Sequence, residues 1–182
     1  MSRSLLPALG LAALIAVVPA SASAQQSSGK SSLDDPTIVA IFDATNTADV
    51  ETSGLAMTKA QHDDVRALAK QFVNDHKAVR QQGRDLAKKL GVTPTPPKDS
   101  SSAVAHRKVM QQLKSASADQ FDCTYLNHEV AFHDAVLKAV SNTLLPAIQN
   151  AELKAFVEKV GPAFKGHLEA ARSLQKKYSC GK

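Results

Sequence analysis

Histidines and carboxylates stand on the apolar faces of four stretches of the chain that have helical spacing. Each stretch carries one such residue or pair: Asp49, His76, Glu129 with His133, and His167. Burying these groups among aliphatic side chains costs several kcal/mol unless each one is paired. Because histidine and carboxylate at one level of a helical core are usual ligands of zinc, iron and copper, the pattern indicates a site for one transition-metal ion.

A polar network without an ion is the alternative explanation of the same residues. In that case Asp49 and Glu129 accept hydrogen bonds from the histidines, and the group only fixes the packing of the core. A single histidine on an apolar face is more often part of such a network than a metal ligand. For four converging stretches neither explanation is preferred, and the sequence leaves both open.

Three secondary metal candidates lie beside these faces. A rotation of about 100° per residue places Asp75, His128 and Glu51 at the margin of the apolar face of their own stretch or away from it. The two other histidines are predicted to lie on the surface, His62 in a turn and His106 in a short linking segment.

Four long helices are the elements that must position these residues. Apolar residues recur at helical spacing over residues 37–60, 64–90, 118–144 and 151–178, and over a shorter stretch at 102–113. Short connections make the first two helices, and likewise the last two, antiparallel neighbours. A proline-rich stretch at 92–99 joins the two pairs. The predicted fold is therefore all-α, a ferritin-like four-helix bundle with one long connection.

Local signals mark the ends of these helices. The residues that can cap a helix N-terminus are Asp34 or Asp35, Ser117 and Asn150. Gly91 is expected to end the second helix. Gly161 and Pro162 are expected to kink the last one, because proline has no N–H to donate to the carbonyl four residues back.

The first part of the chain has the pattern of a secretory signal. Residues 1–24 combine a basic start at Arg3, an apolar run and small residues before the cleavage point. The run is shorter than the roughly 20 residues of a membrane span. We expect a periplasmic or secreted mature chain that begins at Gln25, has no transmembrane segment, and consists of a flexible leader at 25–35 and one bundle domain at 36–180.

Charge and cysteine content narrow the class of protein. The formal net charge is +5 at pH 7, but basic residues are scattered among acids, whereas nucleic-acid binding needs a basic stripe.

In an oxidising compartment Cys123 and Cys180 are predicted to form a disulfide, which the antiparallel third and fourth helices would bring together. The sequence shows no nucleophile–base arrangement, phosphate loop or cofactor motif, so we expect no enzyme, no haem and no nucleotide.

Several short stretches together carry a family resemblance. They are residues 48–51, 72–76, 121–126 with 128–129, 152–156, and Pro162 with 167–168. Over roughly residues 38–175 the chain resembles the exported bacterial proteins of domain-of-unknown-function family 4142. The resemblance implies a ferritin-like bundle and export, and it implies no particular activity.

The di-iron pattern of ferritins is absent from the sequence. That pattern needs Glu-x-x-His on two helices, but Val73 and Phe164 stand three residues before His76 and His167. A bridged di-iron centre is therefore not expected, and a single histidine-rich ion site remains. We predict an exported cell-envelope protein that binds one ion in metal handling or stress. The alternative is a non-catalytic structural or interaction module, and the sequence identifies no protein partner.

Overall fold

The computed structural model describes residues 33–99 and 101–181. The predicted signal at 1–24 and all but the end of the predicted leader lie outside the described residues. Within the described ranges the chain is helical and has no strand. The elements are α1 Asp35–Lys59, α2 Asp63–Lys89, α3 Ser101–Ser115, α4 Ala118–Ala139, the π-helical turn η1 Val140–Leu144, α5 Leu145–Ala147 and α6 Ala151–Lys177.

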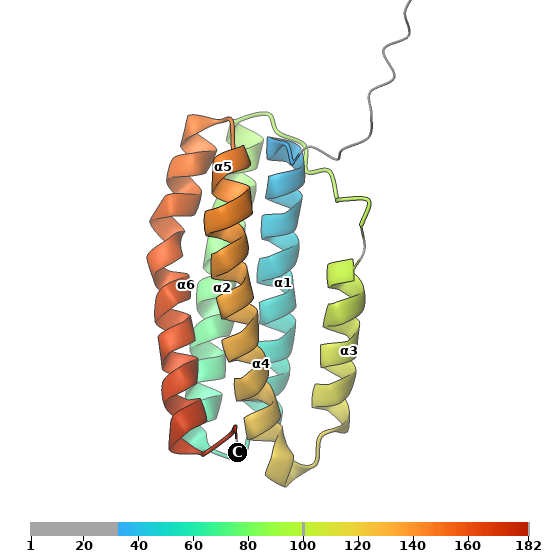
Figure 1. Ribbon diagram of the computed structural model, residues 1–182, viewed down its shortest axis with the longest axis vertical. Helices are drawn as coiled ribbons and strands as arrows, with labels where there is room; N and C mark the ends of the chain where they lie inside the picture. The colour runs from blue at the N-terminus through green and yellow to red at the C-terminus, as the bar shows by residue number, and fades with distance from the viewer. Residues whose placement is uncertain (1–32, 100, 182) are drawn as a thin grey trace, which may run out of the picture. The chain divides into compact units, whose positions relative to one another are not determined.

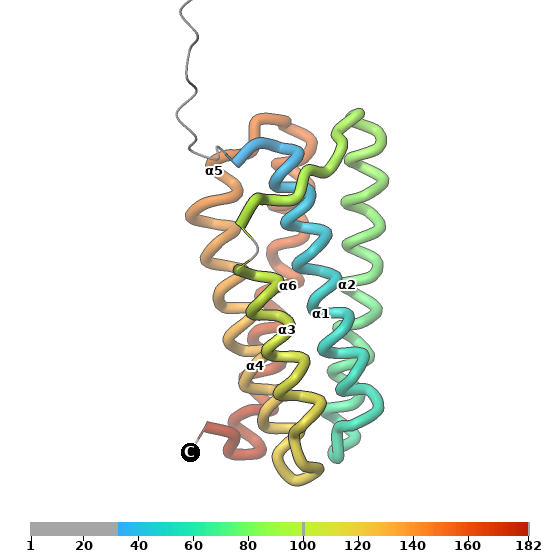
Figure 2. Tube along the Cα trace, turned by 90° about the vertical axis from the view of Figure 1, so that its right-hand side faces the viewer, coloured from blue at the N-terminus to red at the C-terminus, as the bar shows by residue number. Residues whose placement is uncertain are grey.

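Helices α1, α2, α4 and α6 form a four-helix bundle (Figure 1). Each of the hairpins α1–α2 and α4–α6 is antiparallel, and they pack through α2 against α6 and α1 against α4. The proline-rich connection leads from the end of α2 to α3, which lies outside the bundle against α1 and α4 (Figure 2). This arrangement confirms the ferritin-like bundle with one long connection.

Several predicted end signals act as expected. Asp34 Oδ1 accepts the Thr37 amide at 2.9 Å, so Asp34 is the N-cap and α1 begins at Asp35, with Pro36 in its first turn. The Asn150 side chain accepts two amides of the first turn of α6. Gly91 follows α2 with φ +67°, a backbone conformation that glycine adopts without strain. Ser117 stands at the N-cap position of α4, but its side chain makes no capping hydrogen bond.

The third predicted helix ends differently from the expectation. A continuous α-helix was predicted to Leu144, whereas α4 ends at Ala139 and passes into the π-helical turn and the short α5. In this turn the Leu145 amide donates to the Val140 carbonyl five residues back. Pro146 follows directly and has no N–H to restore the α-helical pattern. In contrast, α6 is one continuous helix through Pro162.

Two apolar clusters fill the bundle and leave a polar level between them. One cluster, near the α1–α2 turn, includes Phe72, Phe121 and Tyr125, and the other, near the α5 end, includes Ile38 and Val157. Cys123 and Cys180 lie at disulfide distance beside the first cluster, with Cα atoms 4.9 Å apart, as the predicted helix pairing requires. Among the described residues, no helix combines the length and apolar character of a membrane span.

Candidate metal centre

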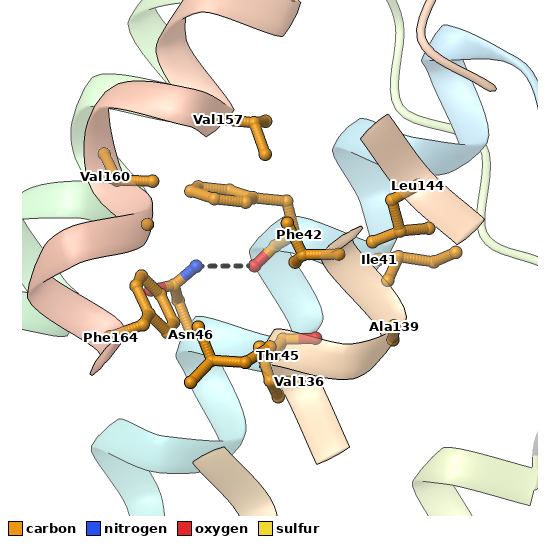
Figure 3. A pocket seen from close by; sticks show the side chains of 13 residues that line it. Ile41, Phe42, Thr45, Asn46, Val136, Ala139, Leu144, Val157, Val160 and Phe164 are labelled. Atoms are coloured by element: carbon orange, nitrogen blue, oxygen red, sulfur yellow. Dashed lines mark hydrogen bonds between the residues drawn. The ribbon is translucent and has the colours of Figure 1, made fainter. Parts of the chain in front are cut away.

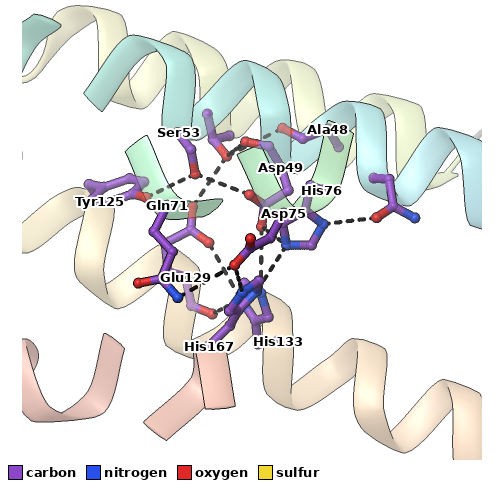
Figure 4. Close-up of polar contacts among 12 residues, drawn as sticks. Ala48, Asp49, Ser53, Gln71, Asp75, His76, Tyr125, Glu129, His133 and His167 are labelled. Atoms are coloured by element: carbon purple, nitrogen blue, oxygen red, sulfur yellow. Dashed lines mark hydrogen bonds and ion pairs between the residues drawn. The ribbon is translucent and has the colours of Figure 1, made fainter. Parts of the chain in front are cut away.

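Five buried side chains from four helices meet midway along the bundle (Figure 4). We call them the core cluster: Asp49 of α1, His76 of α2, Glu129 and His133 of α4, and His167 of α6. None is more than 4% exposed. Ligand atoms of the three histidines lie within 4.8 Å of one another, and so do those of Asp49, Glu129 and His133. The structure thus brings all five primary candidates together, in a group that could hold a metal ion.

Asp49 lies at the centre of the cluster. Its Oδ2 atom is 3.3 Å from His76 Nε2 and 3.6 Å from His133 Nε2. Glu129 stands one turn before His133 on α4, and its Oε2 is 3.4 Å from His133 Nδ1. The α1–α2 hairpin therefore supplies one edge of the cluster, and a single face of α4 supplies the opposite edge.

Each histidine ring directs one nitrogen outward, where an acceptor fixes its proton. His133 Nδ1 lies 3.0 Å from the Glu129 carbonyl and must donate to it. His167 Nε2 lies 3.0 Å from Asp75 Oδ2 and donates to that carboxylate. His76 Nδ1 lies 2.9 Å from Asn46 Oδ1. Since the Asn46 amide nitrogen donates to the Phe42 carbonyl, its oxygen faces His76, and His76 is again the donor.

The inner nitrogens consequently carry lone pairs when the rings are neutral. A neutral imidazole has one N–H and one acceptor nitrogen, and the outward bonds use the N–H of all three rings. His76 Nε2 and His167 Nδ1 face each other across 3.2 Å. His133 Nε2 makes no hydrogen bond to any residue that the structure describes. Three nitrogen lone pairs are therefore directed into one small volume.

Hydroxyl groups contact only one oxygen of each carboxyl group. Thr52 Oγ1 lies 3.2 Å from Glu129 Oε1 and 3.1 Å from the Asp49 carbonyl oxygen, and Ser53 Oγ donates to Asp49 Oδ1 at 3.1 Å. Because Ser53 uses its proton in this way, the Tyr125 hydroxyl at 2.9 Å donates to Ser53, which satisfies this core tyrosine as predicted. Within the described part of the chain, Asp49 Oδ2 and Glu129 Oε2 accept no hydrogen bond.

Burial disfavours charge throughout the cluster. Burial, and then the neighbouring Glu129, hold the pKa of Asp49 well above its usual value, and burial raises the pKa of Glu129 to about 8. Burial, together with the two neighbouring imidazoles, lowers the pKa of His76 to about 2. Burial also lowers the pKa of His133 and of His167, against the opposing effect of a nearby carboxylate. The three rings are therefore neutral near pH 7.

The secondary candidates have different surroundings. Asp75 reaches the cluster only through its hydrogen bond with His167. Glu51 instead pairs with Nε2 of His106 at 2.6 Å, outside the cluster. His128 is partly buried against the Phe132 ring, and burial lowers the pKa of His128 to about 4. The structure does not bring Glu51 or His128 to the core cluster. His62 is half exposed and contacts Asp122.

Two features of the site were not anticipated from the sequence. Asn46 is fully buried and orients His76; its position three residues before Asp49 places both on one helix face, so the spacing could have identified it. An apolar cavity of about 80 Å³ adjoins the cluster, with Asn46 and Phe164 in its wall (Figure 3). Thr45 and Asn46 are the only polar side chains among the lining residues, so the cavity adds no metal ligand.

Comparison with known proteins supports the fold. A family described as "Domain of unknown function (DUF4142)" matches residues 20–174. A crystal structure of a DUF305 fragment from Deinococcus radiodurans is similar, with a TM-score of 0.69 and 14% identity, and the match covers 78% of this chain and 95% of that chain. No curated protein matches the chain. At this identity the structural similarity shows the fold alone.

Proposed function

The chain belongs to the DUF4142 family, and we propose that this member is an exported protein whose core cluster binds one divalent transition-metal ion. The proposed ligands are Nε2 of His76, Nε2 of His133, Nδ1 of His167 and Oδ2 of Asp49. Glu129 is the second carboxylate beside the ion.

The facing lone pairs of His76 and His167 are the observation that carries the proposal. Two neutral nitrogens 3.2 Å apart repel each other unless a cation or a proton lies between them. A proton is poorly held there, because burial lowers the pKa of both imidazoles. A metal ion binds all three inner nitrogens at once and converts the repulsion into coordination. Metal-bound histidines usually donate their other N–H to a carbonyl or carboxylate, as the outward bonds of these rings do.

The spacing of the proposed ligand atoms suits a tetrahedral ion. Metal–nitrogen bonds of about 2.0–2.1 Å in a tetrahedron place neighbouring ligand atoms about 3.3 Å apart. The corresponding distances here are 3.2 Å between His76 and His167, 3.3 Å between His76 and Asp49, and 3.6 Å between His133 and Asp49. The ligand atoms of the three histidines lie within 4.8 Å of one another, so adjustment of their side chains would complete the coordination.

Charge balance also favours a divalent ion. Asp49 and Glu129 are both fully buried, and no lysine or arginine is among the causes of their pKa shifts. One ion of charge +2 compensates both carboxylates, so that the loaded core is neutral. Imidazole with carboxylate suits zinc, copper or iron. Four buried protein ligands leave no open position, which favours a binding role in metal handling over hydrolytic catalysis.

Two observations support export. They are the signal pattern at residues 1–24 and the cysteine pair at disulfide distance, because disulfides persist in oxidising compartments. Mass spectrometry of the native protein tests export: an N-terminus near Gln25 supports it, and an intact Met1 contradicts it.

The competing explanation is a polar network without an ion. In this network the raised pKa values of Asp49 and Glu129 keep both carboxyl groups protonated, so that Asp49 can donate to an inner nitrogen of His76 or His133. A proton given to His133 Nε2 does not lie between His76 Nε2 and His167 Nδ1, so the network leaves their 3.2 Å contact without a bridging proton.

Metal titration tests the proposed function. Full-length mature protein, stripped with chelator, is titrated with Zn²⁺ while heat release and melting temperature are recorded. We expect one ion per chain and a melting temperature that rises with zinc concentration, because an ion that binds only the folded state stabilises it by mass action. No heat and no melting shift with zinc, copper or iron would contradict the proposal.

A further inference from the structure

One edge of the core cluster is hydrogen-bonded to a side chain that reaches solvent. His167 donates to Asp75, whose side chain is 44% exposed and also accepts from Gln71 at 3.4 Å. The acceptors of the other two rings, Asn46 and the Glu129 carbonyl, belong to fully buried residues. Of the acceptors that the structure describes for the three imidazoles, Asp75 alone reaches water. This exposed carboxylate is one hydrogen bond away from a proposed ligand.

The helix segment before His167 is weakened by its own sequence. Gly161, Pro162 and Gly166 fall within the six residues that precede it. Pro162 leaves the carbonyl of Glu158 without its α-helical partner, and glycine is a poor helix former. Such residues lower the free energy of local opening.

Packing does not explain these two glycines. A Cβ atom placed on Gly161 or Gly166 would meet nothing within 4 Å. At Gly83 of α2, in contrast, a Cβ would come within 2.9 Å of the Phe42 ring, so that glycine serves close packing. The other long helix of the same hairpin, α4, has no glycine or proline from Ala118 to Ala139. Among the helix segments next to the five residues of the core cluster, only the segment before His167 combines two glycines with a proline.

We infer that the ion enters and leaves the core cluster past Asp75 and His167. Asp75 acts as a transient ligand that attracts the cation from solvent. Local opening of residues 161–167 withdraws His167 and lets the ion pass. When the segment closes again, His167 returns to the ion and completes its coordination. The inference rests on the proposed function and adds to it that the site exchanges its ion instead of holding it permanently.

Stopped-flow mixing of chelator-stripped, full mature protein with Co²⁺ tests the role of Asp75. Asp75→Asn keeps an acceptor for His167 and removes only the charge. Asp85→Asn is the matched control, because Asp85 lies on the same helix, is exposed, and accepts from Gln81 four residues back as Asp75 does from Gln71. We expect association about tenfold slower in Asp75→Asn and nearly unchanged in Asp85→Asn.

A second pair of variants tests the local opening. Gly166→Ala strengthens α6 without a clash and should slow association and dissociation by the same factor, leaving the affinity unchanged. Gly54→Ala of α1, where a Cβ also meets nothing within 4 Å, is the control and should alter neither rate.

The outcomes separate the two proposals. If Co²⁺ binds but Asp75→Asn behaves like Asp85→Asn, the route past Asp75 is wrong and the metal site stands. If Gly166→Ala leaves both rates unchanged, the opening of α6 is wrong. If the wild-type protein binds no Co²⁺ at equilibrium, the proposed function fails and the exchange route fails with it.

Discussion

The inner nitrogens of His76 and His167 lie 3.2 Å apart, and each ring already donates its N–H to a different acceptor. Two helices that are far apart in sequence thus present lone pairs to each other in a buried core. Asp49 and His133 lie close enough to complete a set of four donors.

Replacing His133 should cost more stability when metal is present than when it is absent. In saturating zinc, at about 100 times the dissociation constant, binding contributes about 2.7 kcal/mol to the folded state, and His133→Ala should lose most of it in addition to the packing of the ring. In chelator the same change should cost only the packing of the buried ring against Phe72. Melting curves of wild type and mutant in both conditions measure this.

The polar network predicts a different pattern for the same variant. His133→Ala would then leave a carboxyl group without its partner and cost about 1–3 kcal/mol with or without metal. A defect of equal size in both conditions would therefore favour the network. His106→Ala, which removes a histidine outside the core cluster, is the control and should respond to neither zinc nor chelator.

The pH dependence of the chelated protein follows from the shifted pKa values. Below pH 6.5, the ordinary pKa of histidine, His76 binds a proton in the unfolded chain but stays neutral in the folded core. The unfolded state is therefore favoured, and stability falls as the pH drops. Glu129, with its pKa raised from 4.5 to about 8, loses its proton earlier in the unfolded chain, so stability falls as the pH rises between these values. Asp49 shifts in the same direction as Glu129.

Above pH 6.5 the histidines are neutral in both states and only the two carboxyl groups contribute, so the chelated protein should lose stability as the pH rises from 6.5. Zinc replaces the carboxyl protons, so it should abolish the loss above pH 6.5. Denaturation midpoints from about pH 5 to about pH 8.5, in chelator and in zinc, measure both effects. Parallel profiles would argue against an ion beside Asp49 and Glu129.

Asn46 should be a positioning residue for the metal. Asn46→Leu keeps the approximate size of the side chain and removes the acceptor of His76 Nδ1. We expect metal affinity to fall about 10- to 100-fold, measured by competition with a chelator of known affinity. Asn74→Leu, at an exposed position of α2, is the control. Equal affinities in the two variants would show that Asn46 does not act through His76.

The cysteine pair should stabilise the bundle without taking part in metal binding. Cys123 and Cys180 are 57 residues apart, and a loop of that length predicts a contribution of about 4 kcal/mol from chain entropy. Peptide mapping under non-reducing conditions should find the two peptides linked. Cys123→Ser should lower the free energy of unfolding and leave the zinc stoichiometry at one. Free thiols in native protein would contradict the bridge.

Much of this fold could be predicted from local signals in the sequence. Helical spacing and the caps at Asp34 and Asn150 sufficed to predict the four long helices. The π-helical turn was not predicted, because the effect of Pro146 on the preceding hydrogen bonds depends on how the chain returns to α6. Apolar periodicity carries no signal for such a change in helix type.

The residues of the candidate site could be predicted from the sequence, but their hydrogen bonds could not. Rotation around each helix placed Asp49 and His76 inward, and placed Asp75 correctly to one side. That Asp75 bonds to His167 depends on how closely α6 approaches that flank of α2. The outward bond that fixes the proton of each ring is likewise a property of tertiary packing, and it decides between a network and a metal site.

X-ray absorption by the zinc-loaded mature protein tests the central claim most directly. The account predicts a coordination shell of three imidazole nitrogens and one or two carboxylate oxygens at about 2.0–2.2 Å, with no sulfur. The His76→Ala variant should lose one imidazole from that shell or lose the zinc. A wild-type shell made of water and carboxylate oxygen, with fewer than two imidazoles, would contradict the account.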